Sequence, residues 1–221
     1  MPRSDPYDVF MATRILLLRH GENTTPHLFN GAELDSPLSE RGRRQAEIMA
    51  RVMLAEQPQA VISSAMLRAV QTASPIAQAC GLPLKIEPDL HERRVGSLSG
   101  KTWDEGGAIW QRTLARWMNG QPDYDETGGE SFVALQQRVL GAWSRLVQAH
   151  AGQTAVVVAH GHVCRCLLLS ILPGWSVARW REMPAIRNVS VTELVQDGQF
   201  WQAVRIDDLH PEVARLGERE K

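Results

Sequence analysis

Residues 14–21 read RILLLRHG, and residues 154–161 read TAVVVAHG. Each stretch is a continuous apolar run rather than an alternating one, which is the pattern of a strand covered on both faces by helices. Each run also ends directly in a His-Gly pair. The two stretches therefore predict two buried strands of a parallel sheet that end in the same way.

The segments around these strands alternate between helical and extended patterns, in the order expected of a mostly parallel sheet. Ser39 is a good cap for one helix, and we expect Ser63 and Ser64 to cap the next, which Gly81 closes. The other expected elements are strands at 60–62 and 84–86, helices at 65–80, 131–150 and 162–172, and a hairpin of strands 190–195 and 200–206 around Asp197-Gly198. The predicted fold is α/β, a three-layer α/β/α sandwich with a mostly parallel central sheet, formed by one domain at residues 14–208.

Both ends of the chain lack this pattern. The first thirteen residues, MPRSDPYDVFMAT, hold two prolines, two aspartates and no long apolar run, so we expect residues 1–13 to form a loose tail. Residues 209–221 are polar, and we expect them to form a frayed tail.

Composition excludes several classes of function. Of the 221 residues, 43% are hydrophobic and 22% charged, and the formal net charge is -1, which gives no sign of a nucleic-acid partner. No run of about 18 apolar residues exists, so we expect no membrane span. The cysteines, Cys80, Cys164 and Cys166, are odd in number, which argues against a secreted disulfide framework and predicts a cytoplasmic protein.

The two His-Gly pairs predict where the chemistry lies. Parallel strands present their carboxyl ends at one edge of the sheet, so His20 and His160 are expected there together. Arg19 precedes His20, and Arg68 stands near the start of a helix, whose free N–H groups favour phosphate. Four cationic or titratable groups at one edge would repel one another without an anion. This pattern predicts a phosphate site.

The same residues resemble those of a known family. RHGE at 19–22, DSPLSERG at 35–42, SSAMLRAVQTA at 63–73, LHE at 90–92 with Gly96 and Gly100, GGES at 128–131 and AHG at 159–161 are similar, in this order, to motifs of the histidine phosphatase superfamily, whose members are phosphoglycerate-mutase-like. The resemblance runs from residue 14 to about residue 172, most of the chain. It implies the same α/β fold.

The resemblance also implies a mechanism. His20 is the expected nucleophile, and a neutral imidazole nitrogen can attack phosphorus near neutral pH. Arg19, Arg68 and His160 are expected to hold the phosphoryl oxygens, because the arginine fork matches phosphate. Glu92 is the expected proton donor, and afterwards the base that activates water.

Neither a cofactor nor a metal is expected. His160 and His162 are the only close histidine pair, and no cysteine or carboxylate stands at ligand spacing to them. The weaker expectations, for residues that bind the substrate or shape its pocket, are Gly21, Glu22, Asn23, Asn30, Gly31, Arg93, Gly161 and His162.

The sequence favours a phosphatase over a mutase. Mutases of the family carry a longer insertion with basic residues before GGES, whereas residues 101–127, the expected insertion on the substrate side, hold three basic and five acidic side chains. By contrast, an arginine directly after the expected proton donor, as in Glu92-Arg93, resembles the sequence of the mutases. Asn23, where many relatives carry Trp, and Ser99, where they often carry Glu or Gln, depart from the family pattern.

The predicted activity is therefore that of a histidine acid-type phosphatase, a phosphoric monoester hydrolase acting on a small phosphorylated substrate. A phosphoglycerate mutase that uses a bisphosphoglycerate primer and a non-catalytic phospho-ligand binding module are the alternatives. Trp103, Trp110 and Trp117 recur every seven residues and would share one helix face, as core packing or as the apolar wall of a substrate pocket. The substrate and the oligomeric state, with a homodimer as one option, stay open.

Overall fold

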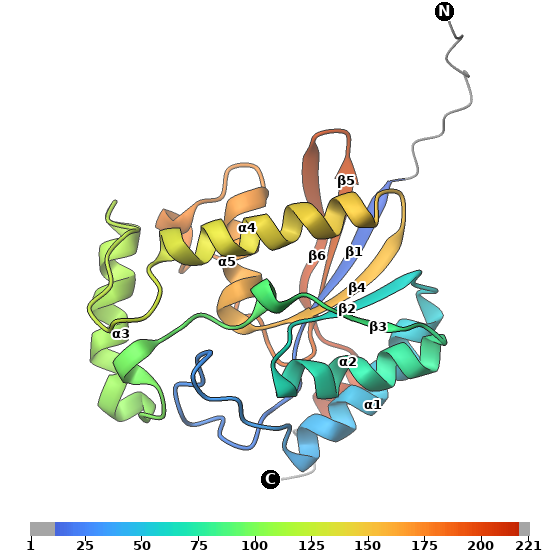
Figure 1. Cartoon of the computed structure of the whole chain (residues 1–221), viewed down its shortest axis with the longest axis horizontal. Helices are drawn as coiled ribbons and strands as arrows, with labels where there is room; N and C mark the ends of the chain where they lie inside the picture. The colour runs from blue at the N-terminus through green and yellow to red at the C-terminus, as the bar shows by residue number, and fades with distance from the viewer. Residues whose placement is uncertain (1–11, 217–221) are drawn as a thin grey trace, which may run out of the picture.

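A computed structural model of the chain describes residues 12–216. Its centre is a six-stranded sheet in the order β3-β2-β4-β1-β5-β6 (Figure 1). The first four of these strands pair in parallel, and β5 and β6 add an antiparallel hairpin at one edge. The strands are β1 (Thr13–Arg19), β2 (Ala60–Ser63), β3 (Leu84–Ile86), β4 (Thr154–Ala159), β5 (Val191–Asp197) and β6 (Phe200–Asp208).

Helices cover both faces of the sheet. On one face, α1 (Glu40–Ala55) packs on α2 (Leu67–Cys80), and α6 (Pro211–Leu216) packs on α1. On the other face lie α4 (Phe132–Ala149) and α5 (Gly161–Ile171), with α3 (Trp103–Met118) at one end of the molecule (Figure 1). Short 3-10 turns occupy Pro88–Leu90, Gly96–Leu98 and Val177–Arg179. The predicted three-layer α/β/α sandwich is confirmed. None of the described helices is both long and apolar enough to cross a membrane.

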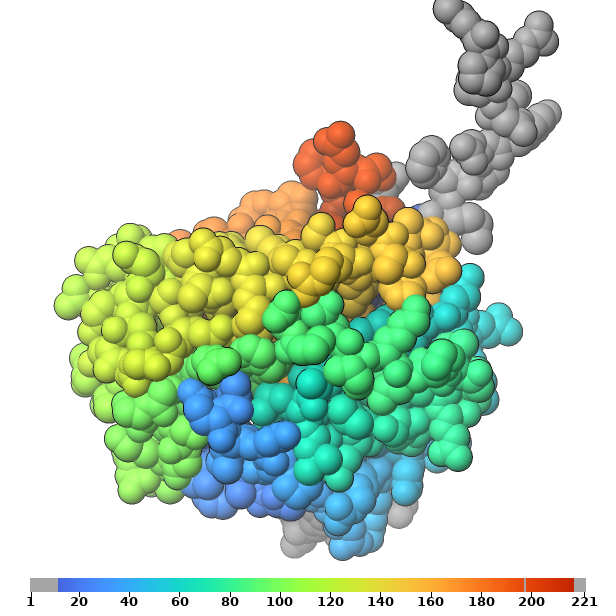
Figure 2. All heavy atoms as spheres, viewed as in Figure 1, coloured from blue at the N-terminus to red at the C-terminus, as the bar shows by residue number. Residues whose placement is uncertain are grey.

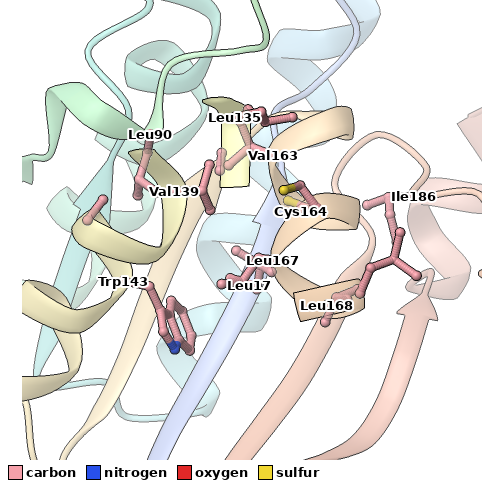
Figure 3. Close-up of a cluster of buried hydrophobic side chains, with 14 of the residues drawn as sticks. Leu17, Leu90, Leu135, Val139, Trp143, Val163, Cys164, Leu167, Leu168 and Ile186 are labelled. Atoms are coloured by element: carbon pink, nitrogen blue, oxygen red, sulfur yellow. The ribbon is translucent and has the colours of Figure 1, made fainter. Parts of the chain in front are cut away.

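The continuous apolar strands have the physical role that their sequence predicts. Along β1, Ile15 and Leu17 face the α4–α5 layer, whereas Leu16 and Leu18 face the α1–α2 layer. Successive side chains of a strand point to opposite faces, so a strand buried on both faces has no polar position. Figure 3 shows the first of these two clusters, where Leu17 meets side chains of α4 and α5.

The structure departs from the sequence expectations at α2. This helix begins at Leu67 rather than residue 65. Ser63 is the last residue of β2, and its hydroxyl donates to the Ser64 carbonyl oxygen at 2.8 Å, so it is not available to the helix. Ser64 does not cap the helix directly: its hydroxyl accepts a hydrogen bond from the Met66 N–H, just before the first turn. The expected capping roles of Ser63 and Ser64 are therefore wrong.

The expected C-terminal tail is also partly ordered. Residues 211–216 form α6, in which Val213 is buried and Glu212 pairs with Arg51 of α1 at 2.9 Å. The polar composition of residues 209–221 gave no sign that Val213 packs against α1. Residues 1–11, most of the expected N-terminal tail, and residues 217–221 lie outside the described residues.

The loop after β1 is held against α1 at a glycine. The Ser39 hydroxyl caps α1 by accepting from the Gly42 N–H at 3.0 Å, and the Ser39 N–H donates to the Glu22 carbonyl oxygen at 2.9 Å. A Cβ on Gly42 would overlap that carbonyl oxygen. The glycine thus lets the loop that carries Gly21 and Glu22 lie directly on the first turn of α1.

We expect Gly42→Ala to lower the free energy of unfolding by about 1–3 kcal/mol, because the added methyl group overlaps backbone that cannot move away freely. The matched control is Gly141→Ala in α4, where a Cβ makes only one ordinary contact, 3.7 Å from Arg145. That variant should gain about 0.5–1 kcal/mol from the better helix propensity of alanine. Urea unfolding of both variants measures the difference, and equal effects would contradict this account.

Candidate active site

The candidate site lies at the carboxyl ends of the parallel strands β1, β4 and β2. Arg19 pairs in register with Ala159, so His20 and His160 leave neighbouring strands at the same level. Their ring centroids are 5.1 Å apart. Both side chains are buried, with 4% and 0% of their surface exposed. Parallel pairing therefore brings together two histidines that are 140 positions apart in the sequence.

Hydrogen bonds fix the ring of His20 in one tautomer. Its Nδ1 lies 2.6 Å from the Gly21 carbonyl oxygen. A carbonyl oxygen only accepts, so in the neutral ring Nδ1 carries the proton and Nε2 keeps its lone pair. The backbone is held too, because the Gly21 N–H donates to Thr72 Oγ1 at 2.9 Å and Asn188 Nδ2 donates to the His20 carbonyl oxygen at 2.8 Å. The site thus presents an unprotonated nitrogen at a fixed position.

Arg68 faces this nitrogen. Its Nε donates to His20 Nε2 at 3.3 Å, and its Nη1 and Nη2 donate to the carbonyl oxygens of Leu34 and Asn30. The guanidinium is fully buried. Asp35 accepts two hydrogen bonds from the Leu67 N–H at the start of α2 and lies 3.7 Å from Arg68. The loop before α1 therefore holds this arginine against Nε2 of His20.

Two buried nitrogens complete a positively charged pocket floor. Within residues 12–216, Arg19 Nε and His160 Nδ1 are shielded from solvent and have no hydrogen-bond partner. Arg19 is anchored by its Nη1, which donates to the Ile186 carbonyl oxygen at 2.8 Å, and His160 by its Nε2, which lies 2.8 Å from Ser64 Oγ. Buried polar groups are normally paired, so an anion beside His20 fits the Arg19 Nε–H, and it fits His160 Nδ1 in the tautomer in which the Ser64 hydroxyl donates to Nε2.

Glu92 lies beside the N-terminus of α5, at the edge of this floor. Its Oε2 accepts from the His162 backbone N–H at 3.3 Å and lies 3.7 Å from His162 Nδ1, while its Oε1 accepts from the Arg93 N–H. Burial raises the pKa of Glu92, but the contacts with His162, the charge of His160 and the Arg93 N–H outweigh it and hold the pKa well below its usual value. The carboxylate is thus ionised in the ligand-free protein.

Both buried histidines are held neutral. Burial, with the charges of His160, Arg19 and Arg68, keeps the pKa of His20 well below its usual value. Burial and the charges of Arg68 and Arg19 do the same for the pKa of His160, against the opposing charge of Glu92. A neutral His20 can act as a nucleophile at and below neutral pH.

The remaining predicted residues divide into two groups. Glu22, Asn23, Asn30, Gly161 and His162 line one cavity of about 340 Å³ together with Arg19, His20 and Glu92. Gly21, Gly31 and Arg93 are not among the described lining residues, and neither are Arg68 and His160, which lie fully buried beneath the cavity beside His20. Gly21 and Gly31 allow close packing of backbone, since a Cβ would lie 2.8 Å from the Gly42 carbonyl oxygen or 2.6 Å from a Val95 methyl group.

Arg93 lies behind the cavity wall, not in it. Its guanidinium packs between Trp110 and Trp117, 5.3 and 5.0 Å from their ring centroids, and its Nε donates to the Glu130 carbonyl oxygen at 2.8 Å. Only 1% of its surface is exposed. The structure therefore places this arginine as a support for the wall, away from the surface that would meet substrate.

Sequence reasoning missed the wall formed by the segment before β5. Trp180, Ala185, Ile186 and Asn188 line the cavity, and Arg165 of α5 lines it as well. This segment has no helical or alternating pattern, so the sequence offered no signal beyond its two tryptophans, Trp175 and Trp180. Phe29, on the opposite side, was also missed because it lies in an irregular loop.

The comparisons with known proteins agree with this geometry. A family model of the histidine phosphatase superfamily, branch 1, matches residues 15–209, and the chain therefore belongs to this superfamily, as the motifs indicated. It is 37% identical over 197 residues to a metal-independent phosphoserine phosphatase of Arabidopsis thaliana, covering 86% of this chain and 79% of the relative. It is 32% identical, over 86% of this chain and 88% of the relative, to a probable phosphoglycerate mutase of Cronobacter sakazakii.

The solved structures give the same result. A mycobacterial glucosyl-3-phosphoglycerate phosphatase superposes with a TM-score of 0.79 at 28% identity, covering 90% of this chain and all of that one. A phosphoglycerate mutase of Bacillus anthracis, at 17% identity and a TM-score of 0.76, shares the fold. The activity of the chain is thus that of a phosphatase or a mutase of this superfamily.

The depressed histidine pKa values predict how stability depends on pH. An unfolded histidine binds a proton near its ordinary pKa of about 6.5, whereas His20 and His160 resist protonation in the folded protein. The unfolded state then binds more protons, so stability falls as the pH is lowered through that value. We expect the melting temperature to fall between about pH 8 and about pH 5, less steeply in His160→Gln than in wild type.

Saturating inorganic phosphate should flatten the wild-type profile, because an anion next to the histidines raises their pKa in the folded state. Thermal melts of both proteins across this range, with and without phosphate, make the measurement. Identical slopes for wild type and His160→Gln would contradict the argument.

Proposed function

We propose that this protein is a metal-independent phosphomonoester hydrolase that forms a phosphohistidine on His20. The observation that carries the proposal is the ring of His20, whose Nδ1 lies against the Gly21 carbonyl oxygen and whose Nε2 is thereby left unprotonated and faces a buried arginine. Folding of the chain does not by itself require that the neutral imidazole of His20 face the buried guanidinium of Arg68. A phosphoryl group would engage both features, because its phosphorus can accept the lone pair of Nε2 and its oxygens can bind the arginine.

In the first step, Nε2 attacks phosphorus, and the bond from phosphorus to the alcohol oxygen breaks. Arg19, Arg68 and His160 stabilise the charge that spreads over the phosphoryl oxygens. The alkoxide that leaves takes a proton from Glu92. The products of this step are the free alcohol, phosphohistidine and an ionised Glu92.

The low pKa of Glu92 in the ligand-free protein is compatible with this role. A phosphate dianion beside the carboxylate is a like charge, and like charges disfavour the ionised form. This repulsion raises the pKa of Glu92 in the substrate complex. The proton that the donor needs is thus acquired with the substrate, not before it.

In the second step, Glu92 accepts a proton from water, and the resulting hydroxide attacks the phosphohistidine. The bond from phosphorus to Nε2 breaks, and inorganic phosphate is released. Glu92 ends this step protonated, loses the proton once phosphate has left and gains another with the next substrate, so one carboxyl group serves both steps.

Hydrolysis is favoured over mutase chemistry by the chain around the cavity. A mutase holds a second phosphoryl or carboxylate group, which calls for basic side chains, but residues 101–127 carry a net charge of -2. The part of that segment that lines the cavity consists of Trp103 and Trp110. The binding-module alternative is disfavoured because both His20 and Glu92 are present and adjacent to the same cavity.

His20→Ala should abolish phosphate release from a panel of phosphomonoesters in excess EDTA, because alanine removes the attacking nitrogen. His27→Ala, an exposed histidine outside the cavity lining, is the control and should keep wild-type turnover. Acid-labile phosphate on His20, detected by mass spectrometry after rapid quenching, reports the intermediate. Release that stops with EDTA, or isomerisation of 3-phosphoglycerate only with a bisphosphoglycerate primer, would overturn the proposal.

Glu92→Gln should lower kcat by roughly 100- to 10,000-fold, since glutamine neither donates a proton to the alkoxide nor accepts one from water. With 4-nitrophenyl phosphate, whose leaving group needs little protonation, phosphoenzyme should accumulate in the variant and decay slowly. Glu47→Gln, on the exposed face of α1, is the matched control. Unchanged phosphoenzyme decay in Glu92→Gln would remove Glu92 from the second step.

A further inference from the structure

Aromatic and aliphatic side chains form about half of the lining of the cavity, as a wall beyond His20. They come from the loop after β1, the turn before α3, α3 itself and the segment before β5. The apolar members of the lining are Pro26, Leu28, Phe29, Val95, Trp103, Trp110, Trp180, Ala185 and Ile186. Figure 2 shows the blue surface of the loop after β1 lying against the green surface of the segment around residue 100, where two of these walls meet.

Trp103 differs from the other aromatic residues of the wall. Trp110 and Trp180 are 8% and 3% exposed, so they offer little more than an edge, whereas Trp103 is 47% exposed. Phe29 backs it, with ring centroids 4.1 Å apart at 45°. An exposed indole supported from behind is a platform on which a second flat or apolar group can stack.

The chain is built to hold this platform in place. The Phe29 N–H donates to the Lys101 carbonyl oxygen at 2.8 Å, which fixes the loop beside the first turn of α3. Gly106 then leaves room for the ring, because a Cβ there would lie 2.6 Å from Phe29 Cε2. The Thr102 hydroxyl and the Glu105 carboxylate form a capping box at the start of α3, which fixes the position of Trp103.

The charged lining residues are engaged elsewhere. Glu22 accepts from Ser39 and pairs with Arg41, and it would repel a second anion. Arg165 Nη2 donates to the carbonyl oxygens of Met183 and Pro184, and its guanidinium stacks 5.2 Å from the centroid of Trp180. Among the described lining residues, the other cation is Arg19, on the phosphate floor. A carboxylate on the alcohol would therefore lose water without gaining a free arginine or lysine partner.

We propose that this apolar wall, with Trp103 as its platform, selects phosphomonoesters whose alcohol carries an aromatic or apolar group and no second charge. The inference rests on the proposed hydrolase function and names its substrate class. Phosphoserine and phosphoglycerates, which appear in the names of the relatives, carry further charged groups, so a direct comparison of substrates tests the inference.

Three substrates separate the possibilities, because each releases an alkyl alcohol and needs similar chemistry at phosphorus. They are benzyl phosphate, with an aromatic group, glycerol 3-phosphate, with a neutral polar group, and O-phosphoserine, with charged groups. We expect kcat/KM of the wild-type protein for benzyl phosphate to exceed that for the other two by about tenfold or more, since a stacked ring stabilises a complex to about this extent.

Trp103→Ala should lower the ratio of kcat/KM for benzyl phosphate to that for glycerol 3-phosphate by about fivefold to tenfold. Trp103→Phe, which keeps a flat ring, should restore most of the ratio. Phe200→Ala is the matched control, because Phe200 is an exposed aromatic residue on β6, outside the cavity lining, and the ratio should not change. A ratio within one protein is insensitive to partial loss of folded enzyme.

The outcomes distinguish this inference from the proposed function. Failure to hydrolyse any of the three esters would contradict the hydrolase function itself. Hydrolysis that favours O-phosphoserine, with a preference that Arg165→Met removes, would keep the function and overturn the apolar subsite in favour of an anion held by Arg165. A ratio that Trp103→Ala leaves unchanged would also overturn it.

Discussion

The hydrogen bond between His20 Nδ1 and the Gly21 carbonyl oxygen is the constraint on which the site depends, since it determines which ring nitrogen is free. It requires the peptide after His20 to point its carbonyl oxygen back at the ring. This carbonyl belongs to the Gly21–Glu22 peptide, whose N–H donates to Gln45 Oε1 of α1 at 2.8 Å, and the N–H of the preceding peptide donates to Thr72 of α2. Gly21 and Gly42 then make the close backbone approach between this loop and α1 possible. The tautomer of one side chain is thus maintained by two helices.

Gathering positive charge on the floor of a buried site has a cost in stability. Burial lowers the pKa of Arg19 and of Arg68 as well as those of the two histidines, which means that the charged forms are disfavoured there. Carbonyl oxygens of Asn30, Leu34 and Ile186 compensate in part by accepting from the arginines. In the proposed mechanism the rest of the compensation comes from the phosphoryl group, which would be bound by groups that the fold itself does not fully satisfy.

Different parts of the fold hold the floor and the walls of the cavity. Strand ends and helix N-termini form the floor, and they are tied to the sheet, whose core fixes them. The walls come from irregular loops and α3, which the sheet does not fix directly. Arg19 connects the floor to the wall. Its Nη1 donates to the Ile186 carbonyl oxygen in the wall, and its Nε has no partner among the described residues. A fold can therefore keep one phosphoryl chemistry while its walls change the alcohol that is accepted.

Much of this arrangement was predictable from the sequence. The continuous apolar runs determine β1 and β4, and because parallel strands end at one edge, the positions of His20, His160, Arg19 and Arg68 follow from local pattern and general topology. Glu92 was predicted only through the family resemblance, since nothing local distinguishes it from a surface carboxylate next to two arginines. The α6 helix was missed because it has only six residues, begins with a proline and buries only Val213.

By itself, then, the sequence determined the sheet, the sites where its buried strands end and the residue types that stand there. Tertiary structure alone decided that Asn188 holds the His20 backbone across 168 positions, that Arg93 supports the wall instead of meeting substrate, and that Trp103 is exposed while Trp117 is buried. Side-chain periodicity reports only the faces of one element. Contacts between irregular segments depend on how distant elements pack, which no local pattern encodes.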